Sequence, residues 1–412
     1  MKYIVNGEVV LPRTLAGPIA PHLRAFAASQ SAQGYAPYSL YRRVLIAADF
    51  SRWLGLRGVA LRRIGFDHQS RYLRYRARHV KPRSDDACSL RRLVEFLRRE
   101  GLVRAEKRTA LPLTPVERCT RAYEQYLYES CASARATVVN YGAFVRDFLN
   151  HCFGIGPVRL GQLRAMDVVK FVQHRATRLS LKRAKLMTSA LRSFLRYARF
   201  HGALKLDLSA AVPTVANWSM SAIPRAIGPD QVRQLLASID RRSAMGRRDY
   251  AVLLLLARLG LRAGEVSSLT LDDIDWQAGQ LCVQGKGGQR SVLPLPADVG
   301  KAIAGYLHQG RPHSSDRCVF VRARAPARGF VGVAGISSIV RHALERAGID
   351  APTKGAHQFR HGLATEMLRK GASLSQIGEL LGHRHPDTTR IYAKVDIKAL
   401  RQLALPWPGA MP

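Results

Sequence analysis

Acidic side chains are scarce in this chain of 412 residues. It has 29 Asp and Glu residues against 65 Lys and Arg residues, which gives a formal net charge of +36 at pH 7. A surface with that excess repels itself unless it lies against a polyanion, so the expected partner is DNA or RNA, with an acidic membrane a distant second. Because 47% of the residues are hydrophobic, general disorder is excluded, and the length predicts two to four domains.

Long apolar runs and paired cysteines are lacking as well. The longest apolar stretch, Ala251 to Ala257, ends at Arg258, and the first residues lack the basic and then apolar pattern of a signal peptide. We therefore expect no membrane span, and we expect the protein to be cytoplasmic and associated with the nucleoid. The six cysteines include no C-x-x-C pair and no histidine at zinc-ribbon spacing, so neither a disulfide framework nor a structural zinc is expected.

The first half of the chain has helical periodicity. Apolar residues recur every three or four positions over 39–54, 66–78 and 90–103, and again over 136–152, 166–178 and 186–204. Phe50 to Leu54 aligns with Val145 to Leu149 at an offset of 95, and Phe96 to Arg98 aligns with Phe194 to Arg196 at an offset of 98. Two basic helical domains, at 1–110 and 111–206, are predicted, either as a degenerate duplication or as two unrelated Arg-rich bundles.

The second half has a different pattern. Residues 207–228 have two prolines and little periodicity, as an extended linker does, and 401–412 is expected to be a loose tail. The domain predicted between them, 229–400, is mainly α-helical with a small β-sheet. Its expected strands are 280–285 and 290–295, joined by a Gly-rich turn, and 318–321. Its expected helices are 229–239, 243–260, 297–308, 335–348, 355–370, 374–381 and 387–394.

Two basic residues in this domain stand at positions suited to an anion. Arg262 follows an apolar helix, and Glu265 three residues later can hold its guanidinium in place for a bidentate contact with a phosphate. Lys286 lies on the hairpin turn, and only 13 of the 65 basic residues are lysines. A lysine there can donate a proton to a leaving oxygen. The glycine spacing is wrong for a nucleotide-binding P-loop, and Gly287 follows the lysine.

The last hundred residues add two histidines, an arginine and a tyrosine. His357 and Arg360 are three residues apart and share a helix face, which suits an anionic phosphate. A metal site at His357 and His361 is disfavoured because Gln358 occupies the place of the metalloprotease glutamate and Arg360 lies within the same turn. Neither His383 nor Tyr392 indicates a functional site by itself. Taken together, Arg262, Lys286, His357, Arg360, His383 and Tyr392 form a set able to bind and attack a phosphodiester.

In this order the residues resemble the tyrosine recombinases, or phage-type integrases. GLRAGEVSSLTLDDID resembles the first arginine box of the family, HQFRHGLATEML its H-x-x-R box, and LLGHRHPDTTRIYAKV its Leu-Gly-His to Tyr segment. The likeness is strong over 229–397 and weaker over 114–206, which resembles the helical core-binding domain. Residues 1–110 exceed what the simple two-domain members need, and an arm-site module, a second DNA clamp and a contact surface for partner recombinases all stay open.

The resemblance implies a role for each residue. Tyr392 would be the nucleophile that keeps the DNA 3′-phosphate as a covalent ester, and Arg262 and Arg360 would stabilise the transition state. Lys286 would protonate the departing 5′ oxygen. His357 would act as general acid and base, and His383 would donate a hydrogen bond to a non-bridging oxygen. No metal and no other cofactor is implied, because the covalent ester stores the phosphodiester bond.

The resemblance also implies an assembly and a biological setting. Four protomers would act on two double-stranded DNA molecules, with possible partner recombinases or accessory DNA-bending proteins, and the large basic N-terminal block favours a mobile genetic element. Two alternatives share some of these features: a type IB topoisomerase-like enzyme, and a non-catalytic DNA-binding regulator with the same fold. The intact set of six residues argues against the regulator, which has no use for Tyr392.

Overall fold

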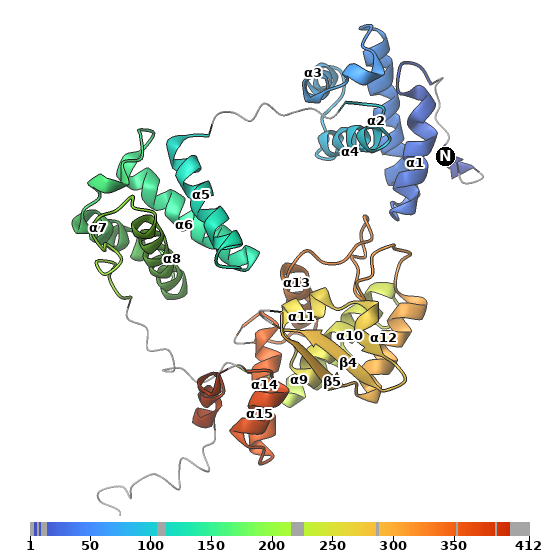
Figure 1. Ribbon diagram of the computed structural model, residues 1–412. Helices are drawn as coiled ribbons and strands as arrows, with labels where there is room; N and C mark the ends of the chain where they lie inside the picture. Colours follow the sequence, from blue (N-terminus) through green and yellow to red (C-terminus); the bar gives the residue numbers. More distant parts are fainter. Residues whose placement is uncertain are drawn as a thin grey trace, which may run out of the picture. The chain divides into compact units, whose positions relative to one another are not determined.

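The computed structural model describes residues 15–104, 113–215, 226–285, 288–351, 353–383 and 385–395, and the backbone of two short strands at 4–5 and 8–9. The chain divides into two compact units, one formed by 1–106 and 223–412 and the other by 107–222 (Figure 1). Large clusters of buried apolar side chains lie within 19–103, 116–212 and 227–359 of the described chain. The fold is mainly α-helical with a small sheet, as the sequence predicts.

Residues 19–103 form a bundle of helices around one of these clusters. Pro37 begins its longest helix, where the fixed φ of proline suits the first turn and its missing N–H costs no hydrogen bond. The rings of Phe50 and Tyr72, both buried, are 5.1 Å apart in the core. Its elements are α1 (Leu23–Ala32), α2 (Pro37–Gly55), η2 (Leu61–Arg63), α3 (Phe66–Ala77) and α4 (Asp86–Arg99), after the short turn η1 (Ala20–His22).

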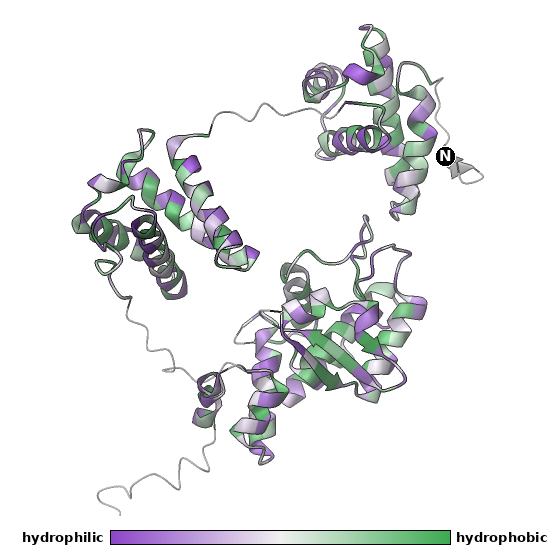
Figure 2. Cartoon of the chain, viewed as in Figure 1, coloured by the Kyte–Doolittle hydropathy of each residue, from purple (hydrophilic) through white to green (hydrophobic). Residues whose placement is uncertain are grey.

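The unit formed by 107–222 is a second helical bundle. It begins with a capping box, in which the Thr114 hydroxyl accepts from the Glu117 N–H at 3.2 Å and the Glu117 carboxylate accepts from the Thr114 N–H at 2.9 Å. Hydrophilic and hydrophobic residues alternate along its helices, as amphipathic helices around a core require (Figure 2). Its elements are α5 (Pro115–Glu129), α6 (Arg135–Phe153), η3 (Leu160–Gln162), α7 (Ala165–Ala176) and α8 (Leu181–Phe200).

The C-terminal part packs helices around a three-stranded antiparallel sheet of order β3-β4-β5. The central helix α10 is buried on nearly all sides, which is why residues 251–256 are apolar without interruption. The strands are β3 (Ile274–Asp275), β4 (Gln280–Gln284) and β5 (Arg290–Pro294). The α-helices are α9 (Pro229–Ala237), α10 (Ala244–Leu259), α11 (Ala263–Ser268), α12 (Ala297–Gln309), α13 (Ala334–Arg346), α14 (His357–Arg369) and α15 (Leu374–Leu380), with 3-10 turns η4 (Leu271–Asp273), η5 (Pro386–Thr388) and η6 (Arg390–Val395).

Two predicted elements differ in the structure. The strand expected at 318–321 is wrong, because the segment makes only isolated bridges, from Cys318 to Thr270 and from Val321 to Gly329. The Arg311 guanidinium takes the carbonyls of Cys318 and Val319 instead of a neighbouring strand. The helix expected at 387–394 is replaced by the short turns η5 and η6. No helix among the described residues has both the length and the apolar character needed to cross a membrane.

Candidate active site

Arg360 lies at the centre of the site, in the first turn of α14, and is only 3% exposed. Its guanidinium donates to the backbone oxygen of Gly260 at 3.0 Å and to that of Leu381, so it ties α14 to the end of α10 and to the end of α15. Gly260 ends α10 at φ +61°, and a Cβ there would lie 2.9 Å from the Leu381 side chain. Burial and then repulsion from Arg262 lower the pKa of Arg360 to about 10, so it stays cationic at neutral pH.

Arg262 is the N-cap residue of α11 and is held by Glu265, the residue that the sequence singled out for this role. The Glu265 carboxylate accepts from the Arg262 backbone N–H at 2.8 Å and from its guanidinium at 2.6 Å. Glu265 is 7% exposed, whereas a third of the Arg262 side chain is exposed. One side of the guanidinium is thus fixed by a buried carboxylate, and the rest of it can meet a ligand from solvent.

Tyr392 lies on η6 and is 1% exposed. Its hydroxyl is 3.0 Å from Nδ1 of His361, which lies on α14 directly after Arg360. Burial raises the pKa of Tyr392, while the charges of Arg360 and Arg262 work in the opposite direction. Burial, His357 and Arg360 lower the pKa of His361 to about 4, so its imidazole is neutral at pH 7. The tyrosine thus has a neutral imidazole next to its hydroxyl and two arginine cations nearby.

His383 follows α15, just after Gly382, which adopts φ +59°. Its Nδ1 is 2.7 Å from the Thr389 hydroxyl, and Thr389 is buried in the turn that leads to Tyr392. Burial, followed by the charges of Arg360 and Arg262, lowers the pKa of His383 to about 4. The bond to Thr389 leaves Nε2 of this neutral imidazole for a ligand.

Two residues of the predicted set remain, His357 and Lys286, and the structure describes only the first. His357 is exposed at the start of α14, with its ring centre 4.8 Å from that of His361. Lys286 lies outside the described residues, and the strands β4 and β5 on either side of it are described. Gln289 and Ser291 of this hairpin line a hollow of about 550 Å³ together with His383. The described residues of the β4–β5 hairpin thus border the same hollow as His383.

The structure thus brings together five of the six predicted residues. The five residues act on one another electrostatically. His357 and Arg360 lie on α14, Tyr392 on η6, Arg262 just before α11 and His383 just after α15. Sequence reasoning missed His361 as a partner of Tyr392. The signal was present in the H-x-x-x-H spacing, which pointed to a metal site rather than to a tyrosine 31 residues away. The arrangement places two fixed guanidinium groups near a tyrosine hydroxyl, a combination of groups suited to an anion.

Two family models match the chain. The phage integrase family matches residues 225–398, which contain the whole of this site, and the phage integrase N-terminal SAM-like domain matches residues 121–202, which lie in the second helical bundle. Neither match reaches the first helical bundle. The resemblance and the enzyme class inferred from the sequence are therefore confirmed over both regions on which they rested.

Comparison with known proteins also gives integrases and recombinases. A Sinorhizobium fredii protein, y4rA, provisionally named an integrase/recombinase, is 54% identical over 409 residues and 99% of each chain. The tyrosine recombinase XerD of Mycobacterium tuberculosis is 32% identical over 71% of this chain and 96% of its own. In fold, the chain resembles XerH recombinase in a post-cleavage complex with its difH substrate (TM-score 0.54, 18% identity, 69% of this chain and 83% of that one).

A second solved structure has the same fold. It is a λ integrase dimer, residues 75–356, bound to a COC′ core site, with a TM-score of 0.53 and 14% identity over 71% of this chain and 99% of that one. The fold, the site geometry, the family models and the full-length relative agree. The chain belongs to the phage integrase family of tyrosine site-specific recombinases.

Proposed function

We propose that this protein cleaves and rejoins double-stranded DNA through a covalent phosphotyrosine at Tyr392. The observation that carries the proposal is the Tyr392 hydroxyl, 3.0 Å from a neutral His361 imidazole and in the field of Arg262 and Arg360. The tyrosine oxygen forms a bond to phosphorus while the bond from phosphorus to the 5′ oxygen breaks. The 3′-phosphate stays on the enzyme and a free 5′-hydroxyl leaves. Reversal of the same step by another 5′-hydroxyl rejoins the strand.

The two arginines would stabilise the charge that develops on the non-bridging oxygens. Both are fixed before the substrate arrives, Arg262 by Glu265 and Arg360 by two backbone carbonyls, so little reorganisation is needed during the reaction. His383, oriented by Thr389, would donate a further hydrogen bond to the phosphate. These contacts supply the charge stabilisation that the reaction needs without a metal or another cofactor.

The protons need a donor and an acceptor. His361 would accept the proton of the Tyr392 hydroxyl in this proposal, since its Nδ1 is 3.0 Å from that hydroxyl. His357, exposed at the start of the same helix, would exchange protons with solvent as the general acid and base. Lys286 would protonate the departing 5′ oxygen, as the resemblance implies.

The burial of Tyr392 implies a conformational step. At 1% exposure for Tyr392 and 3% for Arg360, neither side chain can reach a phosphodiester in this arrangement, so η6 must shift when DNA or another protomer binds. In this resting arrangement the nucleophile is protected from unproductive reaction. We expect the covalent intermediate only when the correct DNA is present.

The substrate, assembly and setting belong to the proposal as well. Solved relatives include a λ integrase tetramer bound to a Holliday junction and the integrase of the transposon Tn1549 with a circular intermediate DNA. We propose that this chain likewise acts on duplex DNA at the nucleoid as a tetramer, in the service of a mobile genetic element. Accessory DNA-bending proteins or partner recombinases would assist it. A topoisomerase-like activity would relax supercoils without exchanging strands.

The experiment is a trapping assay. Nicked suicide duplexes drawn from the DNA that flanks the gene are incubated with the protein, and a denaturing gel reports any covalent adduct. Exchange of strands between two labelled duplexes then separates a recombinase from a topoisomerase. Relaxation of a supercoiled plasmid without any exchange would contradict the proposed function.

A further inference from the structure

The first helical bundle repeats the second one element by element. Each has a second helix of 19 residues, then a 3-10 turn of three residues, then a helix of 12 residues. The starts of these elements in the two bundles are 98 or 99 residues apart. The first and last helices also correspond, although α5 and α8 are longer than α1 and α4.

The buried positions coincide as well. Under offsets that rise from 97 at the start of the bundle to 101 at its end, buried residues of one bundle fall on buried residues of the other. The pairs include Ile19 with Val116, Phe26 with Tyr123, Phe50 with Phe148, Ile64 with Leu163, Tyr72 with Phe171, Leu90 with Leu191 and Leu97 with Ala198. The offsets predicted from the sequence, 95 and 98, are each wrong by three. Three residues are close to one helical turn, so hydrophobic periodicity alone cannot detect the error.

Specific interactions recur at equivalent positions. An ion pair joins the second and third helices in both bundles, between Asp49 and Arg76 at 3.3 Å and between Asp147 and Arg175. The rings of Phe50 and Tyr72 are 5.1 Å apart, and those of their equivalents 5.2 Å apart. Two unrelated bundles can share periodicity, but they have no reason to share both an ion pair and a ring pair at the same offsets.

The ends of the last helices also agree. Gly101 after α4 and Gly202 after α8 both adopt φ +70°, the left-handed conformation that ends a helix. The rings of Phe26 and Phe96 are 5.6 Å apart, and those of their equivalents Tyr123 and Tyr197 are 5.3 Å apart. Of the two interpretations that the sequence left open, the structure supports the duplication.

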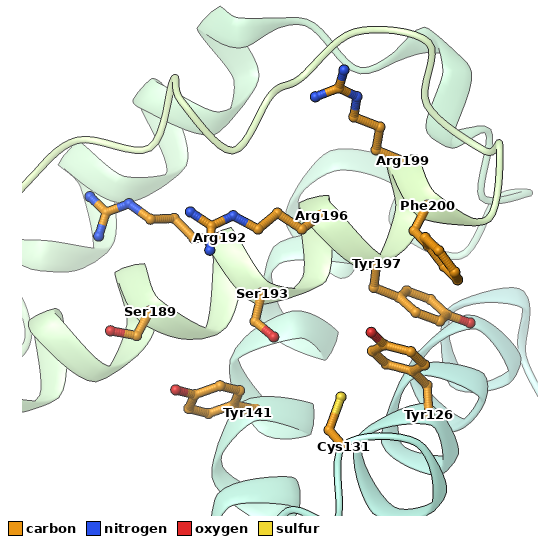
Figure 3. Close-up of a pocket in the computed structure, with 10 residues that line it drawn as sticks. All are labelled: Tyr126, Cys131, Tyr141, Ser189, Arg192, Ser193, Arg196, Tyr197, Arg199 and Phe200. Atoms are coloured by element: carbon orange, nitrogen blue, oxygen red, sulfur yellow. The ribbon is translucent and has the colours of Figure 1, made fainter.

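We propose that residues 19–103 are a second copy of the SAM-like domain, and that this copy binds the phosphates of duplex DNA through α4. The outward side of α4, here called the α4 stripe, consists of Arg91, Arg92, Glu95, Arg98 and Arg99. Its equivalents on α8 are Arg192, Ser193, Arg196, Arg199 and Phe200. In the second bundle these residues line a hollow of about 840 Å³, with the three arginine side chains on one side of α8 and tyrosine rings on the other (Figure 3). Arg192 also donates to the carbonyls of Val212 and Pro213, and Arg199 pairs with Asp207.

The charge of the first bundle fits this partner. Residues 15–104 contain 18 Lys and Arg residues against six Asp and Glu residues. Arg43 of α2 and Arg92 of α4 both lie over the ring of Tyr35, at 3.9 and 5.4 Å, so the basic surface extends from α4 to α2. A row of guanidinium groups matches the repeating phosphates of a duplex. The proposal rests on the proposed function, in which DNA is the substrate. It extends the DNA-binding surface to residues that neither family model covers.

The test compares two variants of the full-length chain, each of which loses two positive charges. Arg91→Ala with Arg99→Ala removes two exposed cations from the α4 stripe. Arg62→Ala with Arg63→Ala removes two exposed cations from η2, where the second bundle has Gly161 and Gln162. Binding to a long mixed-sequence duplex is measured across a salt series. Thermal unfolding of both variants checks that the bundle stays folded.

The stripe variant should bind several-fold more weakly, and its plot of log affinity against log salt should be shallower by roughly 0.9 for each phosphate that the stripe no longer neutralises. The η2 variant should stay close to the unsubstituted chain. Equal duplex affinities and salt slopes for the two variants would overturn the proposal. Normal duplex binding by a stripe variant that no longer assembles into oligomers would also overturn it, because the stripe would then contact protein and not DNA. Since this assay needs no cleavage, its failure is distinct from a missing Tyr392 adduct.

Discussion

The helical bundles and the C-terminal part use their arginines differently. In the C-terminal part, Arg262 and Arg360 come from separate elements, are fixed by a buried carboxylate and by two carbonyls, and act on each other's charge. In the bundles, arginines such as Arg91 and Arg196 are spread along exposed helix sides. Under the proposed function, the convergent cations act together on a single phosphate, and each of the spread cations makes a small contact with a different phosphate. Single substitutions should therefore have drastic effects on chemistry in one region and graded effects in the other.

The largest effect is expected at Arg360. Arg360→Ala removes a transition-state contact and leaves the carbonyls of Gly260 and Leu381 without their donor, so adduct formation should fall by at least about 10²–10³-fold. The control is Arg258→Ala, which removes an exposed arginine paired with Asp298 at the surface of the same region. Rates of adduct formation on a suicide duplex check both. An Arg360→Ala variant that cleaves at the rate of Arg258→Ala would refute the convergent role.

The next largest effect is expected on the stability of the two helical bundles, whose cores should be equivalent. Phe50→Ala and Phe148→Ala each remove a fully buried ring and should lower the free energy of unfolding of their own bundle by about 3–5 kcal/mol. Because the chain has several cores, each variant should shift one transition in a urea titration followed by circular dichroism. If one substitution were costly and the other neutral, the two cores would not be equivalent.

A smaller effect is expected from pH, in the C-terminal part alone. The pKa values of His361 and His383 are lowered to about 4 in the folded chain from an ordinary 6.5. As the pH falls below 6.5, the unfolded chain takes up protons before the folded chain does, so stability is complete above that pH and declines toward pH 4. The melting temperature of this part should fall over that range. The decline should be weaker in His361→Asn and in His383→Asn, and an undiminished decline in both would contradict the assignment.

The smallest effect tests the repeated ion pair. Asp49→Asn and Asp147→Asn should each cost about 0.5–1 kcal/mol of bundle stability, because the side chains are partly exposed and solvent screens the pair. Urea titrations of the two variants provide the measurement. Similar small decreases support equivalence, whereas a decrease confined to one bundle would show that the pairs differ in role.

The sequence predicted most of the helices because each buries an apolar face at regular spacing, as along α2 and α8. It predicted the β4–β5 hairpin because strand alternation surrounds a Gly-rich turn. It misplaced a strand at 318–321 because an arginine side chain there takes carbonyls that a neighbouring strand would otherwise bind. Short-range patterns do not report which distant group satisfies a segment's backbone.

The candidate site shows the same division. The residue types and spacing identified Arg262, His357, Arg360, His383 and Tyr392 as a set, but the burial of Tyr392 and its contact with a histidine 31 residues away depend on how η6 packs on α14. The role of Glu265 was predictable because it lies three residues from Arg262, within the same helical turn. Local partners can be predicted from spacing, and long-range partners require the fold.

The measurement that tests the central claim most directly is the covalent adduct itself. The chain and its Tyr392→Phe variant are incubated with nicked suicide duplexes from the DNA flanking the gene, and peptide mapping by mass spectrometry locates any bound nucleotide. We predict an adduct on Tyr392 in the unsubstituted chain, and none in the variant, which should still bind the duplex because the phenylalanine fills the same space. An adduct on another residue, or an undiminished adduct in the variant, would contradict the claim that Tyr392 is the nucleophile.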